Sequence, residues 1–332
     1  MSNDGRGGIL VTGATGQIGS ELTMFLRERY GGARVVAGVH RTQPTGALKD
    51  SGPHAVVDLT RPQTVVDVLD RYGVDTVYNM AAVLSAVGEQ NPDVAWRVNL
   101  DGLYTLLEIG RERGLKRLFC PSSIAVFGPD TPRDHTPQMT ILRPKTMYGI
   151  TKVAGELLAE YYWERYGLDV RGIRFPGIIS NQTLPGGGTT DYAVDMFYRA
   201  IADAPYTCFV REDTVLPMMY MPDCIRATII LMEAEGEALR HRASYNVAAM
   251  SFAAGELARE IRRHVPGFQC EFEPDHRQAI ADSWPRSIDD AAAREDWGWQ
   301  PEFDLAAMAI DMLEMLRERR KQGASEDVLD EG

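Results

Sequence analysis

The sequence predicts an α/β fold of the Rossmann type, a doubly wound parallel sheet followed by a smaller mixed C-terminal domain. Three observations predict it. Short β-branched runs alternate with helix-like stretches from Ile9 to about Arg174, a glycine-rich turn follows the first run, and this pattern loosens after Phe175. Strands that alternate with helices are typical of βαβ units, which build parallel sheets.

Six strands and four helices are expected in the first half. Apolar runs rich in β-branched residues predict the strands, and the stretches between them have the periodicity of helices. Helix ends are expected at Tyr30-Gly31-Gly32 and at Gly114, because glycine commonly follows the last helical residue. The expected strands are 9–12, 34–39, 55–59, 76–80, 117–121 and 170–175, and the expected helices lie near 17–30, 62–72, 92–113 and 145–166.

The chain divides into two expected domains and a tail. Residues 1–175 are expected to bind a dinucleotide, and residues 176–320 to bind mainly the substrate, with some later segments returning to the first domain. The second part contains a glycine-rich loop (185–192) and a final amphipathic helix over 304–320. The tail, 321–332, is acidic and rich in small residues, so we expect it to be disordered.

The bulk composition favours a small-molecule partner. The formal charge is −12 without a long Lys/Arg run, which disfavours nucleic acid and anionic membranes. No apolar run reaches the length of about 18 residues that spans a bilayer, and the four cysteines form no C-x-x-C pair. With no signal-peptide pattern at the N-terminus, we expect a cytoplasmic protein. The six histidines lack the spacing of paired metal ligands, so no metal is expected.

A phosphate-binding turn is expected directly after the first strand. The segment TGATGQIGSEL (12–22) places Gly13, Gly16 and Gly19 between an apolar strand and a helix. Glycine lets the backbone approach a pyrophosphate, and the helix start, at Gln17 and Ile18, offers N–H groups without intrahelical partners. The alternative is a tight turn that only packs the strand against the helix.

The ends of the second and third strands bear on the choice of cofactor. A dinucleotide site normally has an acidic residue at the end of the second strand, but Val39 stands there, followed by His40 and Arg41. His40 is a candidate to stack near adenine and Arg41 to pair with a 2′-phosphate, or both are solvated. Asp58, which precedes Leu59, is a candidate partner of adenine or a cap of the next helix. We expect NAD, with tolerance of NADP.

Tyr148 and Lys152 form the candidate catalytic pair. Their spacing places both side chains on one face of a helix. A free phenol has a pKa of about 10, but a neighbouring cation stabilises its phenolate, which can then take an alcohol proton while a hydride leaves the same carbon. The alternative is a ring stacked on an ordinary surface lysine. Ser123, with Ser122 as its substitute, lies where open α/β sheets bind ligands and is expected to polarise the reacting oxygen.

Six motifs together resemble the extended short-chain dehydrogenase/reductases over nearly the whole chain. The resemblance implies that Ser123, Tyr148 and Lys152 are the catalytic set, and that Lys152 also holds the nicotinamide ribose. It further implies that Asn99 supports a proton relay and that Ala81, Ala82 and Ile178 line the cofactor. The motifs are TGATGQIG, NMAA, RVNLDG, PSSIAVFG, YGITK and RFPGII.

Longer blocks resemble one type within this family, the short-chain type of L-threonine 3-dehydrogenases. The resemblance implies NAD-dependent oxidation of the C3 hydroxyl of L-threonine to 2-amino-3-oxobutyrate, with Tyr148 as the general base. The blocks are AAVLSAVGEQNP, SSIAVFGPDTPRDHTP, RFPGIISNQTLPGGGTTDYAVDMFY and ADSWPRSIDDAAAREDWGW.

An amino-acid substrate requires a group that binds its carboxylate near the tyrosine. The loop GGGTTDY offers backbone N–H groups, among them that of Gly186, and the hydroxyls of Thr189 and Thr190. Alternatively, one of these threonines only caps the helix that follows.

Three further residues are candidates for contact with the amino acid. Ser85 follows the fourth strand, at the edge where ligands bind. Trp284 either forms the wall of a methyl pocket or belongs to the core. Arg133 either pairs with the carboxylate or lies solvated in its loop.

Two functions are alternatives to a dehydrogenase. One is a nucleotide-sugar epimerase or dehydratase of the same class. Enzymes that resemble this class carry an arginine that binds the sugar diphosphate, but Leu216 stands at that position here. A non-catalytic dinucleotide sensor would keep the glycine turn without needing the catalytic set. The family resemblance also implies a homodimer or higher homo-oligomer joined through the helices expected at 92–113 and 145–166.

Overall fold

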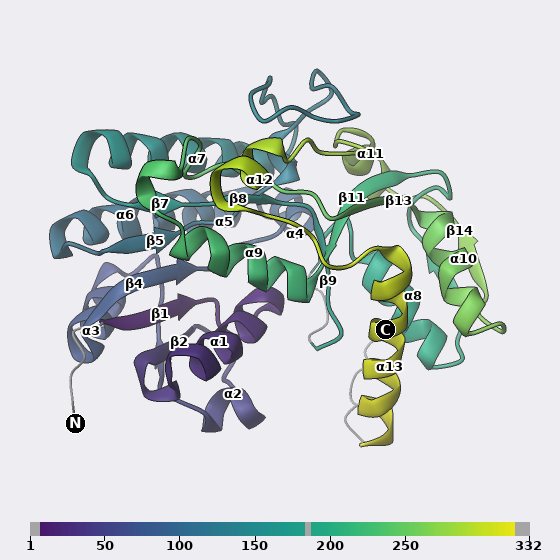
Figure 1. The fold of residues 1–332 in the computed structure, drawn as a ribbon, viewed down its shortest axis with the longest axis horizontal. Coiled ribbons are helices and arrows are strands. Elements are labelled where there is room, and N and C mark those ends of the chain that lie inside the picture. Colours follow the sequence, from purple (N-terminus) through teal and green to yellow (C-terminus); the bar gives the residue numbers. More distant parts are fainter. Residues whose placement is uncertain (1–6, 183–186, 323–332) are drawn as a thin grey trace.

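A six-stranded parallel sheet lies at the centre of the computed structural model, which describes residues 7–182 and 187–322 (Figure 1). The chain builds outward from β1 to one edge and then returns to build outward from β4, so the strand order reverses between β1 and β4. The doubly wound parallel sheet expected from the sequence is confirmed. Across the sheet the strands are β3 (His54–Val56), β2 (Val35–Val39), β1 (Gly8–Thr12), β4 (Val74–Asn79), β5 (Arg117–Phe119) and β7 (Val170–Arg171).

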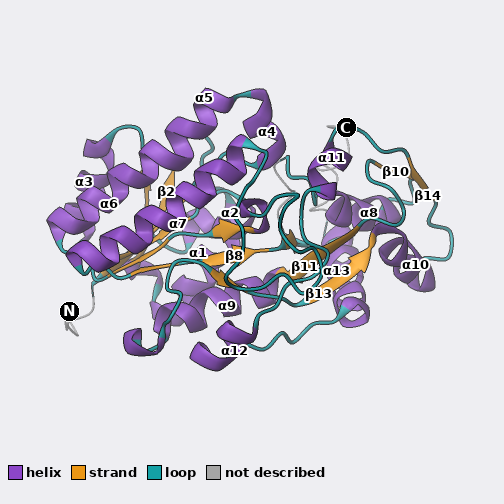
Figure 2. Cartoon of the chain, turned by 90° about the horizontal axis from the view of Figure 1, so that it is seen from above, coloured by secondary structure: helices purple, strands orange, loops and turns teal. Residues whose placement is uncertain are grey.

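Helices cover both faces of this sheet (Figure 2). On one face α3 (Pro62–Tyr72), α6 (Gly102–Arg113) and α7 (Met147–Tyr166) lie side by side. On the other face α1 (Gln17–Tyr30) packs against α9 (Met221–Glu233). A separate apolar core fills each layer. Every residue of β1 and β2 is buried, which explains their continuous apolar sequences.

The helix expected over 92–113 is interrupted, so that expectation was wrong in its continuity. It consists of α5 (Pro92–Ala95), a π-helical segment (Trp96–Asp101) and then α6. Two short helices, α2 (Gly46–Asp50) and α4 (Ser85–Gln90), were not expected. Single π-turns occur often at functional sites, and this one contains Asn99.

The strand expected at 117–121 ends at Phe119, and the strand expected at 170–175 divides in two. The short strand β6 (Ser122–Ser123), which follows the first of them, and β8 (Ile173–Phe175), the second part of the other, leave the central sheet and join β12 (Tyr245–Asn246) in a three-stranded sheet. Pro121 lacks the N–H that would continue the ladder. At Gly172 a Cβ would lie 2.5 Å from the carbonyl oxygen of Ala243, so only glycine allows this crossing.

The second half adds two small sheets, a group of helices and a core of its own. The helix expected over 304–320 is confirmed as α13, and the tail from residue 323 onward lies outside the described residues. In the described part of the chain, no helix is both long and apolar enough to cross a membrane. One sheet contains β9 (Gly177–Ile179), β11 (Val215–Tyr220) and β13 (Met250–Ala253), the other β10 (Tyr206–Cys208) and β14 (Cys270–Phe272); the helices are α8 (Tyr192–Ile201), α10 (Ala254–His264), α11 (Arg277–Asp282), α12 (Ala291–Trp297) and α13 (Leu305–Lys321).

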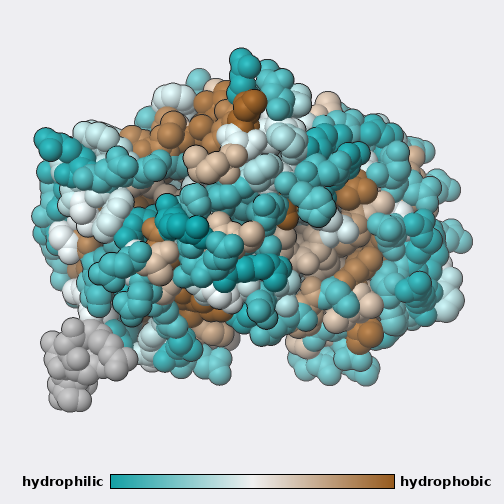
Figure 3. Space-filling model, turned by 45° about the horizontal axis from the view of Figure 1, so that its top comes forward, coloured by the Kyte–Doolittle hydropathy of each residue, from teal (hydrophilic) through white to brown (hydrophobic). Residues whose placement is uncertain are grey.

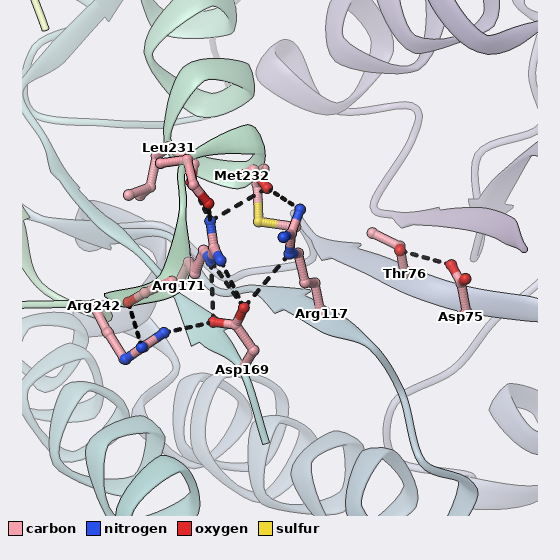
Figure 4. Close-up of polar contacts among 10 residues, drawn as sticks. Asp75, Thr76, Arg117, Asp169, Arg171, Leu231, Met232 and Arg242 are labelled. Carbon is pink, nitrogen blue, oxygen red and sulfur yellow. Dashed lines mark hydrogen bonds and ion pairs between the residues drawn. The ribbon is translucent and has the colours of Figure 1, made fainter. Parts of the chain in front are cut away.

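A buried arginine ties a later segment to the central sheet (Figure 4). Arg171 in β7 is fully buried and its Nη2 lies 2.7 Å from Oδ2 of Asp169. Its Nη1 donates to the carbonyl oxygen of Leu231 at 2.7 Å, and Arg117 donates to that of Met232 at the same distance. These contacts give donors to carbonyl groups in the last turn of α9, where the oxygen of Leu231 also accepts from the backbone nitrogen of Ala234 at 3.3 Å. The domain boundary near residue 175 stays a prediction, since later segments contact the first half closely.

Candidate active site

A cavity of about 550 Å³ opens beside the glycine turn and extends to residues of the second half. It lies where the strand order reverses, the place at which open α/β sheets bind ligands. Most of the residues predicted from the sequence meet on its wall. They are Gly16, Gln17, Ile18, Gly19, Ala82, Ser85, Ser123, Tyr148, Lys152, Ile178, Thr189, Thr190 and Trp284.

The glycine turn has the geometry of a phosphate-binding loop. Gly13 has φ of +62°, and a Cβ there would lie 2.7 Å from the backbone nitrogen of Ala81. A Cβ on Gly19 would collide with the Gly13 carbonyl. Gly16 is the N-cap of α1 and offers no side-chain cap. The buried Nε2 of Gln17 finds no hydrogen-bond partner among the described residues. A group rich in acceptors, such as a pyrophosphate, fits this surface.

The residues at the end of β2 form an exposed cationic group around one carboxylate. Nε2 of His40 and Nε of Arg61 each lie 3.5 Å from Oδ2 of Asp58, and Arg41 is exposed beside them. Partial burial opposes ionisation of Asp58, but hydrogen bonds from Thr60 and the two neighbouring cations lower its pKa below the ordinary value. The N-cap of α3 is Arg61, so the alternative that Asp58 caps this helix was wrong.

A second, smaller cavity of about 30 Å³ lies behind Lys152 and is lined in part by Ala81 and Asn99. Its volume is close to that of one water molecule. Asn99 is fastened in place, because its Oδ1 accepts from the backbone nitrogen of Val83 at 2.8 Å and its Nδ2 donates to the Val83 oxygen at 2.9 Å. Leu59 is buried in the core and appears in the described lining of neither cavity, which argues against the cofactor contact expected for it.

The start of α7 places the candidate catalytic pair. Thr146 caps this helix with its side chain, and Tyr148 follows in the first turn. The ammonium of Lys152 lies 5.5 Å from the centre of the Tyr148 ring and donates to the carbonyl oxygen of Pro121 at 2.7 Å. Lys152 is therefore a partly buried residue that faces the phenol, not an ordinary surface lysine. Ser123 reaches the same cavity from β6.

The part of the cavity wall formed by Ser85 and the loop before α8 is polar, but it differs from the carboxylate-binding loop we expected. The hydroxyls of Ser85 and Thr189 are buried and lie 3.3 Å apart. The backbone N–H groups of Gly187 and Gly188, however, both donate to Oδ2 of Asp191, at 3.0 and 2.6 Å. These two donors are therefore engaged. The N-cap of α8 is Asp191, so neither threonine caps the helix.

Asp191 is the functional candidate that the sequence reasoning missed. It lines the cavity, and burial raises its pKa to about 6. Both of its hydrogen bonds end on Oδ2, and within the described chain Oδ1 has neither a hydrogen bond nor an ion pair. Among the described lining residues only Asp191 and Lys152 carry charge. The carboxylate directly after GGGTT was the signal available in the sequence.

The remaining predicted residues support the cavity in different ways. Trp284 is 5% exposed and belongs to both the wall and the core, so its two alternatives hold together. Arg133 donates from Nε to the carbonyl oxygen of Trp284 at 3.0 Å and is absent from the described lining. Its expected pairing with a carboxylate is therefore not supported. Thr190 packs against Gly177. Gly186 lies outside the described residues.

Comparison with known protein families shows to which family this chain belongs. The description of the NAD-dependent epimerase/dehydratase family matches residues 9–248, well over half of the chain. The chain belongs to this family. Within the epimerase/dehydratase family the matched stretch covers the glycine turn, the catalytic pair and Asp191.

Several members of the epimerase/dehydratase family that resemble this chain are L-threonine dehydrogenases. The mitochondrial L-threonine 3-dehydrogenase of Bos taurus is 46% identical over 92% of this chain and 81% of its own length. The holo structure of the GalE-like L-threonine dehydrogenase from Cupriavidus necator is 52% identical, with a TM-score of 0.90 over 93% of this chain and 99% of that chain. A monomeric L-threonine 3-dehydrogenase from a metagenome is 47% identical, with a TM-score of 0.90 and the same two coverages.

Proposed function

We propose that this protein oxidises the C3 hydroxyl of L-threonine to 2-amino-3-oxobutyrate, with NAD as the hydride acceptor. The observation that carries the proposal is the charge on the cavity wall, where the lysine beside the candidate base and the partly buried carboxylate of Asp191 are the two charged groups among the described lining residues. An amino acid supplies an ammonium for that carboxylate. Identity of 46% and 52% to L-threonine dehydrogenases supports the choice of substrate.

The glycine turn supports NAD as the cofactor. The unpartnered amide of Gln17 and the start of α1 at Gly16, which has no side-chain cap, fit a pyrophosphate. Ile18, Ala82 and Ile178 would hold the rest of the cofactor along the cavity wall. When bound, NAD supplies the hydride acceptor, and the residues of the chain supply orientation and the proton path.

Tyr148 acts as the general base in this proposal. The ammonium of Lys152 near its ring favours the phenolate, since an opposite charge stabilises the ionised form. The phenolate oxygen takes the proton from the C3 hydroxyl while the hydride leaves C3, so a ketone forms and the phenol becomes neutral. Ser123 donates a hydrogen bond to the reacting oxygen from the opposite segment of the wall.

Asp191 binds the substrate ammonium, and the hydroxyl pair of Ser85 and Thr189 binds the carboxylate. A buried carboxylate without a counter-charge is costly, and a cationic ligand relieves that cost. The free Oδ1 of Asp191 can accept a charge-assisted hydrogen bond, which is stronger than a neutral one.

The missing acidic residue at the end of β2 supports tolerance of NADP. Val39 is buried at that place, while His40, Arg41 and Arg61 gather beside it. The positive charge of the two arginines would favour a 2′-phosphate, whereas a carboxylate at Val39 would disfavour one.

Exposed apolar side chains support association of two chains through α6 and α7. Hydrophobic surface gathers at the top of the molecule in Figure 3, on the side where α7 runs in Figure 1. The exposed apolar residues of these helices and the adjoining π-helical segment are Trp96, Tyr104, Ile150, Leu157, Tyr161 and Tyr166. Clusters of this kind are typical of protein interfaces, and sedimentation of the wild-type chain will report its state of association.

A single assay tests the proposed function against the nucleotide-sugar alternative. Leu216, where an epimerase would carry its diphosphate-binding arginine, is fully buried in β11. We expect L-threonine with NAD to produce the absorbance of reduced nicotinamide, and UDP-glucose to remain unconverted. No absorbance change with L-threonine would remove the proposal.

A further inference from the structure

Three buried side chains form a polar triangle behind the candidate catalytic pair, in which Glu156 bonds to the other two. Ser122 donates from Oγ to Oε1 of Glu156 at 2.5 Å. Arg174 donates to the same carboxylate twice, from Nε to Oε1 at 2.9 Å and from Nη2 to Oε2 at 2.8 Å. The charged side chains of Arg174 and Glu156 are only 5% and 7% exposed. The proposed chemistry uses neither of them.

The triangle joins the two segments that carry the reacting groups. Glu156 lies four residues after Lys152 and eight after Tyr148 in α7, so all three side chains fall near one face of the helix. Ser122 directly precedes Ser123 in β6, and its backbone pairs with that of Arg174 in β8. Glu156 therefore connects the helix of the base with the strand of the polarising serine.

The first turn of α7 packs closely on the segment after Ser123, since a Cβ on Gly149 would collide with the carbonyl oxygen of Ala125, but the packing is looser further along the helix. The cavity of about 30 Å³ lies between the same segments, and its lining includes Ser122, Lys152 and Glu156. The other bond across the gap, from Lys152 to the oxygen of Pro121, uses an ammonium that must also serve the phenol. The bond between Ser122 and Glu156 carries no such second duty, and together with the bond from the backbone nitrogen of Ala125 to Oγ of Ser123, at 3.2 Å, it holds the serine segment in place.

We propose that Glu156, acting through Ser122, is a positioning residue that sets the hydroxyl of Ser123 against the phenol of Tyr148. This inference rests on the proposed function, because it assigns those two groups to the proton transfer. A displacement of about 1 Å between reacting groups can reduce a rate about 100-fold. A merely structural bond would leave the rate of the bound complex unchanged.

Ser122→Ala is the decisive variant, because Glu156→Ala would leave the buried charge of Arg174 without a partner and is expected to unfold the protein. Ser122→Thr restores the hydroxyl. Thr228→Val is the matched control: it removes a buried hydroxyl that donates to the oxygen of Cys224 at 2.8 Å, in α9, outside the described lining of both cavities. The full chain is assayed with L-threonine and NAD.

We expect Ser122→Ala to lower kcat about 10- to 100-fold, with KM for NAD changed less than about twofold, and Ser122→Thr to recover most of kcat. Thr228→Val should leave kcat near the wild-type value. Glu156→Gln should also lower kcat, partly by removing the charge that pairs with Arg174, and the double variant with Ser122→Ala should lose less than the product of the single losses, since the Ser122 bond is common to both. Additive losses, or an unchanged kcat in Ser122→Ala, would overturn the inference.

Crystal structures of the wild type and Ser122→Ala separate this inference from the proposed function. We expect the distance from the Ser123 hydroxyl to the Tyr148 phenol to differ between them. An unchanged distance refutes the positioning role whatever the substrate is. An inactive wild type with a changed distance refutes the choice of L-threonine and leaves the positioning role supported.

Discussion

Asp191→Asn should make the protein more stable and a poorer enzyme at the same time. Burial raises the pKa of Asp191 from 3.8 to about 6, a shift that corresponds to roughly 3 kcal/mol of cost for ionising it in the folded state. The asparagine oxygen can still accept from Gly187 and Gly188. Its amide needs a partner of its own, and a buried unsatisfied donor costs about 1–3 kcal/mol. We expect a net gain on the order of 1 kcal/mol above pH 7.

The pH dependence of this gain follows from the direction of the shift. Because the folded pKa is raised above the unfolded one, the wild-type carboxyl favours folding below pH 3.8 and loses that contribution as pH rises through about 6. The difference in free energy of unfolding between Asp191→Asn and wild type should therefore grow between these values and level off above about pH 7. Denaturant unfolding at several pH values measures it.

Binding should change in the opposite direction. Hydrogen bonds to charged groups contribute about 1.5–3 kcal/mol, so KM for L-threonine should rise roughly 10- to 100-fold in Asp191→Asn. (R)-3-hydroxybutyrate keeps the carboxylate and the C3 hydroxyl but lacks the ammonium, so its kcat/KM should be nearly unaffected. Asp195→Asn, one turn further along α8, is the control, because Asp195 is partly buried like Asp191 but is absent from the described lining of the cavity. Equal losses on both substrates, or lower stability at every pH, would refute the reasoning.

Three further variants test other parts of the site. Tyr148→Phe should lower kcat about 100- to 10,000-fold by removing the base, with the Kd for NAD nearly unchanged in a fluorescence titration; a near-normal rate would exclude proton transfer by this residue. Arg41→Ala should reduce kcat/KM for NADP and not for NAD, and a strong NAD preference in the wild type would end that idea. Burial raises the pKa of Glu21 to about 7, against a hydrogen bond from Ser180. Glu21→Gln should therefore raise Tm above pH 7 and not below pH 4.5, whereas the exposed Glu28→Gln should not; equal effects at both pH values would contradict this.

Local chemistry explains what the sequence could predict. The turn around Gly13 and the spacing of Tyr148 and Lys152 are properties of neighbouring residues, so their patterns survive without knowledge of the tertiary fold. Pro121 and Gly172 are also local signals that interrupt strands, although the apolar pattern around them predicts continuous strands. Glycine in a strand often indicates a close approach of another segment, as it does here.

The role of Asp191 could not be predicted because it depends on how its loop folds back. The same loop residues, Gly187 and Gly188, looked like donors for a ligand and proved to be donors for Asp191. Likewise, Arg133 looked free to bind a carboxylate, but tertiary contact places its Nε against the oxygen of Trp284. Sequence identifies groups that can donate or accept, whereas burial and competition decide which of them remain available to a ligand.

The same competition explains how a fold shared with nucleotide-sugar enzymes can select an amino acid. A sugar diphosphate carries negative charge and requires cationic partners, but the described wall beyond Lys152 offers only the carboxylate of Asp191. That carboxylate would repel a diphosphate and, being buried, gains from a cation. In the proposed function Asp191 therefore contributes to selection against the sugar, together with Leu216 in place of an arginine, and to selection for the ammonium, so a single substitution at Asp191 should weaken both.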